Sequence, residues 1–158
     1  MKSIRRANIV VVAGSDHGLM LAARLRRMEV ARVTSVAGLE QARRMCLAGE
    51  TDVCVVALDD VIPDAVPMAE SDAPGRASGV PSLVVVHTVT PYLSKVARRC
   101  GYVAAVPAAI PARMLYRRLG AALQRRRAAH RTPRMQIGNV IAGQAAAEFG
   151  DFRKPTFH

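Results

Sequence analysis

The sequence has little of what many binding proteins and membrane proteins use. It contains no tryptophan, only three tyrosines and three phenylalanines, and no apolar run long enough to span a membrane. So few aromatic side chains argue against a surface on which nucleobases stack. The N-terminus leads straight into an apolar strand pattern without a signal-peptide core, so we expect a cytoplasmic protein.

Cysteine is scarce as well, and its spacing does not fit a metal or redox motif. The three cysteines, Cys46, Cys54 and Cys100, are odd in number and form no C-x-x-C pair, so we expect reduced, buried thiols. Cys54 and His87 fall on different predicted strands, and no aspartate is placed to orient the imidazole, which disfavours a catalytic pair. We therefore expect no enzymatic activity.

Acidic residues are missing from nearly half of the chain. The formal net charge is +11, and no Asp or Glu lies between residues 73 and 147, although arginine is frequent there. A positive surface attracts an acidic protein, a nucleic acid or an anionic membrane. The alternative interpretation is that the arginines only keep the surface solvated.

What the chain does contain is a repeat of short apolar runs, rich in β-branched residues, that do not alternate with polar residues. Such runs are typical of strands covered on both faces in a parallel sheet. The predicted strands cover residues 8–13, 30–36, 53–58, 82–87 and 102–106. Helical patterns are found at residues 16–28, 38–48, 91–100 and 111–127. The alternation of strand and helix predicts a doubly wound α/β fold.

The alternation is interrupted between residues 59 and 81, where five prolines and glycines precede Pro81. The third crossover helix is therefore predicted to be short or missing, at most a turn over residues 65–70, with the remainder a mobile loop. We predict one domain over residues 1–128. Residues 129–158 are predicted to form a linker and tail, with room for one short helix over residues 140–149.

Four phrases of the sequence resemble the receiver domain of two-component response regulators, over about residues 7–127. They are Ile9-Val-Val-Val before a polar turn, Thr51-Asp-Val-Cys-Val-Val before an acidic turn, Val80-Pro-Ser-Leu-Val-Val-Val before a hydroxyl residue, and Ala97-Arg-Arg-Cys-Gly-Tyr. The resemblance implies a five-stranded parallel sheet of flavodoxin-like type and a role in bacterial signal transduction. It is more specific for the fold than for the function.

The resemblance also implies a phosphorylation site, which this sequence largely lacks. In the family, an acidic pair after the first strand helps to hold Mg²⁺, and a lysine after the fifth strand neutralises the phosphoryl oxygens. Here the acidic pair falls on Ala13 and Gly14, and the lysine position falls near Ala108. We therefore expect a degenerate receiver, or pseudo-receiver, that is not phosphorylated and has no cofactor.

The ends of the third and fourth predicted strands offer candidates for remnants of the phosphorylation site. The spacing back from Pro63 selects Asp59 as phosphoacceptor, whereas the spacing from Asp52 selects Ala57. If the third and fourth strands both extend by two residues, Asp59 and Thr88 are the vestigial acceptor and hydroxyl. The candidate vestigial site consists of Asp59, Asp60, Asp16 and Thr88, and it would bind Mg²⁺ only if Asp59 is an active acceptor. Asp16 is equally well explained as a helix cap.

In receivers, as the resemblance implies, partners or a second copy dock on the face made by the fourth helix, the fifth strand and the fifth helix. The candidate residues of this face are Tyr92, Lys95, Arg98, Arg99, Tyr102, Arg113, Arg117 and Arg118. We expect an acidic protein partner or a homodimer. Two alternatives stay open: a stand-alone receiver phosphorylated on Asp59, and a basic nucleic-acid-binding regulator. Against the second, no helix-turn-helix follows the receiver-like segment.

Overall fold

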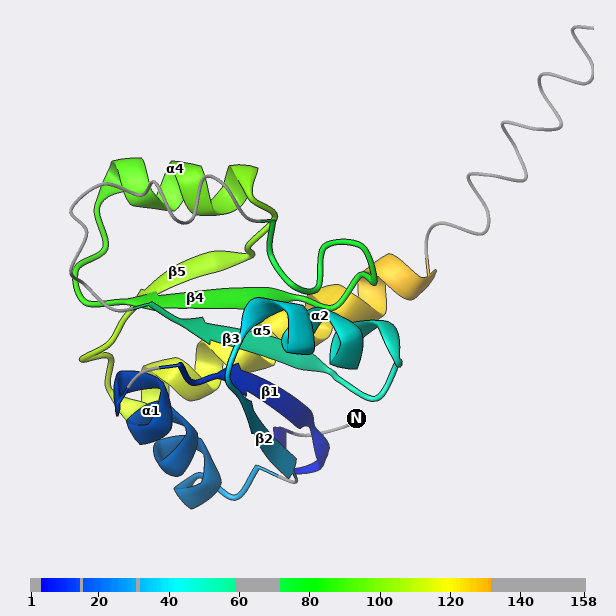
Figure 1. Ribbon diagram of the computed structural model, residues 1–158, viewed down its shortest axis with the longest axis horizontal. Coiled ribbons are helices and arrows are strands. Elements are labelled where there is room, and N and C mark those ends of the chain that lie inside the picture. The colour runs from blue at the N-terminus through cyan, green and yellow to red at the C-terminus, as the bar shows by residue number, and fades with distance from the viewer. Residues whose placement is uncertain (1–3, 15, 31, 59–71, 132–158) are drawn as a thin grey trace, which may run out of the picture. The chain divides into compact units, whose positions relative to one another are not determined.

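The computed structural model describes residues 4–14, 16–30, 32–58 and 72–131, and these form one parallel sheet with helices on both faces (Figure 1). The sheet has five strands in the order β2-β1-β3-β4-β5, and all neighbouring strands are parallel. The strands are β1 (Asn8–Val12), β2 (Arg32–Val36), β3 (Val53–Ala57), β4 (Ser82–Val86) and β5 (Ala104–Pro107). This confirms the predicted α/β class and the five-stranded parallel sheet.

A short 3-10 helix, Ile4–Arg6, precedes β1, and four α-helices flank the sheet. The helices are α1 (Asp16–Arg27), α2 (Leu39–Leu47), α4 (Pro91–Arg99) and α5 (Ala112–Arg131). Within the described ranges, no helix is long and apolar enough to cross a membrane. The chain divides into a compact unit of residues 1–126 and a second unit of residues 127–158. The short helices predicted over residues 65–70 and 140–149 lie outside the described residues.

Each strand contributes side chains to two separate hydrophobic cores, because successive residues of a strand point to opposite faces. Val11 belongs to the core that α1 and α5 cover, together with the buried stripe of α5 that includes Leu115 and Leu119. Val10 belongs to the other core, which α2 and α4 cover, with Ala42 among its members. Valine is used in both cores, which explains why the strands appear in the sequence as unbroken apolar runs.

An ion pair of low exposure fastens α5 to the edge of the sheet where the strands begin. Asp52, just before β3, accepts hydrogen bonds from the backbone amide of Asn8 at 2.9 Å and from the guanidinium of Arg126 at 3.0 Å. Both partners of the ion pair are only 18% exposed. Arg126 also donates to the carbonyl oxygen of Thr51. These bonds connect β1, β3 and α5, which are far apart in the sequence.

Replacing Asp52 by alanine should therefore lower the free energy of unfolding by about 2 kcal/mol, because Arg126 and the Asn8 amide lose a charged acceptor. Urea unfolding followed by circular dichroism measures this loss. The matched control is Glu40→Ala, which removes an exposed ion pair with Arg43 and should change stability by less than about 0.5 kcal/mol. Equal losses in the two variants would contradict the stabilising role of the Asp52 pair.

The segment before β4 differs from the predicted mobile loop where the structure describes it. Ala73, Pro74 and Gly75 are buried. The Ala73 amide donates to the Cys100 carbonyl at 2.8 Å, and the Gly75 amide donates to Ser82 Oγ at 3.1 Å. Residues 73–80 are thus a packed turn rather than a loose loop. Proline and glycine stopped a regular helix here, but their small side chains also allow the close packing.

Candidate functional site

The C-terminal edge of the sheet is where open α/β folds place their ligands, and the two residues that directly follow β1, Ala13 and Gly14, carry no polar side chain. The amide of Ala13 donates to the Val36 carbonyl at 2.8 Å, so the backbone is held against β2. A Cβ atom on Gly14 would lie 3.1 Å from the Ala37 carbonyl oxygen. Neither residue supplies a side-chain oxygen, and the space around Gly14 is tight.

Helix α1 packs unusually closely on this end of β1. A Cβ atom on Gly18 would lie 2.5 Å from the Cα of Ala13, closer than such atoms ever approach, so glycine is required where the helix meets the strand. The contact shows that α1 lies directly against the backbone of Ala13.

At β5 the position expected for lysine is occupied by a methyl group. The amide of Ala108 donates to the Val86 carbonyl at 2.7 Å, which fixes the segment after β5 to the end of β4. Arg24 of α1 donates to the carbonyl oxygen of Ile110 in the same segment. The arginine therefore bridges α1 and the β5–α5 connection, a role that no sequence pattern indicated.

The structure describes two of the four candidate vestigial residues, Asp16 and Thr88. Asp16 is the exposed first residue of α1, and Thr88 is exposed two residues beyond β4. Asp59 and Asp60 lie outside the described residues. Strands β3 and β4 end at Ala57 and Val86, so the described structure does not bear out strands extended by two residues.

The two described candidates, Asp16 and Thr88, do not by themselves make the Mg²⁺ site that the receiver fold implies. That ion needs several oxygen ligands, and the described residues contain no group of three His, Cys, Asp or Glu side chains able to hold a metal. Thr90, rather than Thr88, has a defined structural role after β4, since its hydroxyl accepts from the Leu93 amide at 3.1 Å and caps α4.

The predicted basic face is exposed except at one residue. Six cationic side chains of α4 and α5 are exposed: Lys95, Arg98, Arg99, Arg113, Arg117 and Arg118. Tyr92 is 69% exposed, and Met114, which the prediction did not include, is 50% exposed. These eight residues, on α4 and α5, are called the basic face below. The basic face thus combines six exposed cationic side chains with two exposed large side chains, Tyr92 and Met114.

The prediction was wrong for Tyr102, which is only 4% exposed. Strand β5 begins at Ala104, so Tyr102 belongs to the turn after α4, and its amide donates to the Ala97 carbonyl at 2.9 Å. This turn directs the ring into the core under α2 and α4. Burial raises the pKa of the Tyr102 hydroxyl above its usual range.

The cysteines are free and buried, as predicted. Cys46 of α2 and Cys54 of β3 form a thiol hydrogen bond, and this bond together with burial raises the pKa of Cys54. His87 is exposed, whereas Cys54 is completely buried.

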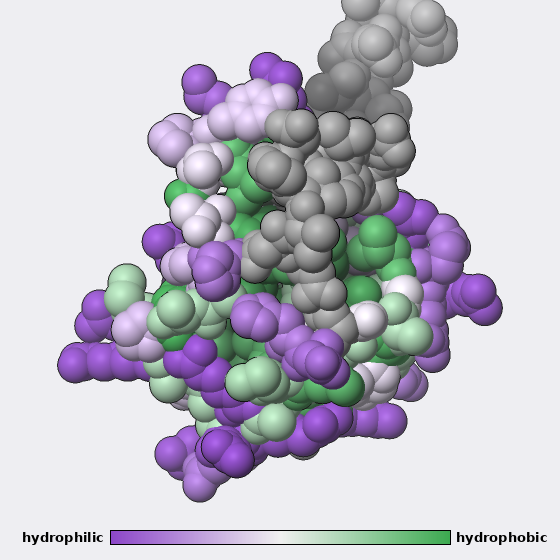
Figure 2. Space-filling model, turned by 60° about the vertical axis from the view of Figure 1, so that its left-hand side comes forward, coloured by the Kyte–Doolittle hydropathy of each residue, from purple (hydrophilic) through white to green (hydrophobic). Residues whose placement is uncertain are grey.

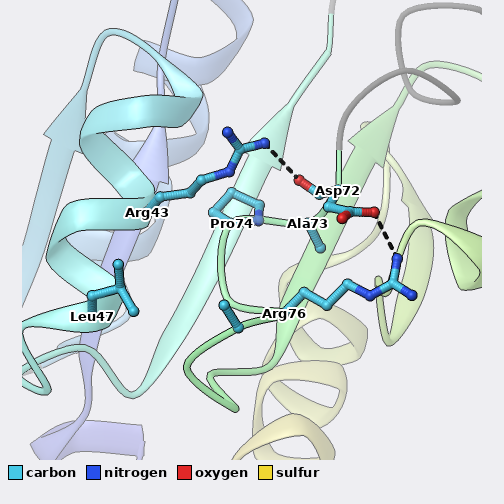
Figure 3. Close-up of a pocket in the computed structure, with 7 residues that line it drawn as sticks. Arg43, Leu47, Asp72, Ala73, Pro74 and Arg76 are labelled. Carbon is cyan, nitrogen blue, oxygen red and sulfur yellow. Dashed lines mark hydrogen bonds and ion pairs between the residues drawn. The ribbon is translucent and has the colours of Figure 1, made fainter.

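A cavity of about 630 Å³ lies between α2 and the packed turn before β4 (Figure 3). Arg43 and Arg76 reach toward Asp72 from opposite sides of its mouth. Arg43 donates to the Asp72 carbonyl at 3.3 Å, and Arg76 pairs with the Asp72 carboxylate at 2.6 Å. The charged groups of this cavity therefore bind one another, which weakens it as an anion site.

No family model and no curated protein sequence matches this chain. Solved structures do match. A pilus assembly-related protein from Burkholderia pseudomallei is 19% identical with a TM-score of 0.64, covering 79% of this chain and 95% of that one. A CheY-like response regulator receiver domain from Methanospirillum hungatei is 13% identical with a TM-score of 0.58, covering 78% and 98%.

A third match comes from the Saccharomyces cerevisiae co-crystal structure of the histidine phosphotransfer protein Ypd1 and the receiver domain of Ssk1. It is 12% identical with a TM-score of 0.54, covering 75% of this chain and 89% of that one. At these identities the matches establish the fold, which is that of CheY-like receiver domains. They do not carry over the chemistry of a site, because one fold hosts many functions.

Proposed function

We propose that this protein is an atypical receiver domain that is not phosphorylated and acts in signal transduction by binding another protein. The observation that carries the proposal is the C-terminal edge of the sheet, where Ala13, Gly14 and Ala108 stand at the positions of metal and phosphate ligands. Phosphoryl transfer to an aspartate depends on a bound cation and on neutralisation of the phosphoryl oxygens. No enzymatic activity is proposed.

The charge of the basic face favours an acidic protein as the partner. The sequence from residue 73 to residue 147 contains no Asp or Glu, so α4, β5 and α5 carry no carboxylate side chain. In a two-fold symmetric dimer the same patch meets itself, and arginines would then face arginines, which costs free energy. An acidic surface would instead be complementary to the basic face. The Saccharomyces cerevisiae structure of similar fold is likewise a co-crystal of the Ssk1 receiver domain with another protein, Ypd1.

Incubation with acetyl phosphate and Mg²⁺ should leave the mass of the intact protein unchanged, because Ala13, Gly14 and Ala108 cannot position the ion and the phosphoryl group. Mass spectrometry measures the result, with a conventional receiver domain treated in parallel as the positive control. A phosphoryl mass that is gained by the protein and lost in Asp59→Asn would overturn the proposal. It would establish the alternative, a stand-alone receiver phosphorylated on Asp59.

A further inference from the structure

A second cavity, of about 420 Å³, lies between α1 and the C-terminal ends of β4 and β5. In Figure 1, α1 lies beside the start of α5 at this edge. Val85 of β4, Ala108 after β5 and Leu21 of α1 contribute apolar surface, and Met20 and Ala23 of α1 add more. The volume falls in the range of about 300 to 1,000 Å³ that is usual for small-molecule sites.

Among the residues that the structure describes, the ionisable side chains that line this cavity are all basic. They are His17, Arg24 and Arg27 of α1, and the described lining includes no Asp or Glu. The space-filling view of this side shows apolar side chains between hydrophilic ones (Figure 2). Asp16 is the nearest acid along α1, and it is exposed at the start of the helix.

The 630 Å³ cavity differs from this one in its charges. There both neighbouring arginines are paired with a carboxylate, Arg76 with that of Asp72 at 2.6 Å and Arg43 with that of Glu40 at 2.5 Å. Here one arginine, Arg24, donates to the carbonyl oxygen of Ile110, a neutral group, so its positive charge is not cancelled by that contact. A cavity with apolar walls and uncompensated basic side chains is complementary to a ligand that has both an apolar part and a negative charge.

We infer that this cavity binds a small amphipathic anion: a carboxylate, or a similar acid group, attached to an apolar chain or ring. The acid group would contact Arg27, and the apolar part would lie against Met20, Ala23 and Val85. The cavity lies at the C-terminal edge of a parallel sheet, which is the usual ligand position in open α/β folds. The inference goes beyond the proposed function and depends neither on a protein partner nor on the absence of phosphorylation.

Octanoate is a suitable probe, because it joins a carboxylate to an apolar chain that the cavity can hold. Titration of the ¹⁵N-labelled full chain should shift the amide signals of Val85 and Ala108 at millimolar concentration. Octyltrimethylammonium, which has a similar chain and the opposite charge, should leave them in place. Shifts caused equally by both compounds would overturn the inference, as would no shift with octanoate.

Two variants locate the site. Ala23→Trp, at an exposed helix position, should fill the cavity and weaken octanoate binding at least about ten-fold. Arg27→Gln should weaken it roughly five-fold, as expected for one partly exposed ion pair. The matched control is Arg26→Gln, which removes the same charge from the same helix outside the cavity lining and should leave the affinity unchanged.

Other outcomes contradict the inference clearly. Octanoate affinity that survives both Ala23→Trp and Arg27→Gln would place the binding elsewhere. An acidic peptide that shifts the same signals while octanoate does not would assign the cavity to a protein partner. Circular dichroism of each variant shows whether the fold is kept. If Ala23→Trp fails to fold, Arg27→Gln, a mild change at the surface, still tests whether octanoate binds in this cavity.

Discussion

Replacement of Gly75 by alanine is expected to lower the free energy of unfolding by about 3 kcal/mol. A Cβ atom at this position would lie 1.9 Å from the Val80 carbonyl oxygen and 2.7 Å from its carbon. Both are backbone atoms, and the Val80 amide also donates to the Gly75 carbonyl at 3.1 Å, so the turn cannot open without losing that bond. The added methyl group must displace the segment that leads into β4.

Urea unfolding of Gly75→Ala measures this loss, with Gly38→Ala as the matched control. A Cβ atom on Gly38 would meet nothing within 4 Å, and its φ of −145° is open to any residue. Because Gly38 is the N-cap of α2, where alanine is less favourable than glycine, the control should lose no more than about 1 kcal/mol. If Gly75→Ala were equally stable, the turn before β4 would not be packed as described.

The double variant Arg98→Glu with Arg117→Glu is expected to abolish binding of an acidic partner. It replaces two exposed cations of the basic face by carboxylates, and like charges across an interface cost several kcal/mol. Both positions are exposed on helices, so the fold should be unaffected. Quantitative pull-down from the native cell extract, followed by binding measurements with the captured protein, tests the effect.

The matched control reverses two other exposed arginines, Arg32 on β2 and Arg44 on α2, and makes the same change in net charge. This control variant should still bind the acidic partner, because we expect binding to depend on the arginines of the basic face rather than on the net charge of the protein. Duplex DNA should bind weakly and be released at physiological salt, where non-specific contacts are screened. Tight DNA binding that persists at that salt concentration and is lost only in the Arg98 and Arg117 variant would replace the protein-partner proposal with the nucleic-acid alternative.

The sheet could be predicted from the sequence because its strands are buried on both faces. The valine-rich runs of β1, β3 and β4 leave no other arrangement for so much apolar surface, and the spacing of Leu115, Leu119 and Leu123 marked the buried side of α5. The first and last residues of the helices and strands were harder to predict from the sequence. The apolar pattern placed Tyr102 in a strand, although the strand begins at Ala104, and this error moved an interior ring to the predicted surface.

Contacts between distant residues could not be predicted from periodicity. Arg24 reaches the Ile110 carbonyl and Arg126 reaches Asp52, across 86 and 74 residues of sequence. In the sequence both arginines look like ordinary surface charges. For the same reason the basic cavity beside α1 was not foreseen, because its walls come from one helix and the ends of two strands. The proline and glycine residues before β4 likewise indicated a break in regular structure but not whether the segment was loose or packed.

The close fit at the end of β1 has an evolutionary consequence. An aspartate at position 14 would bring its Cβ 3.1 Å from the Ala37 carbonyl oxygen. It would therefore require a small shift of the β2–α2 connection besides the substitution itself. That substitution would cost stability before any metal ion could bind, so selection for folding alone would oppose an acidic side chain at this position.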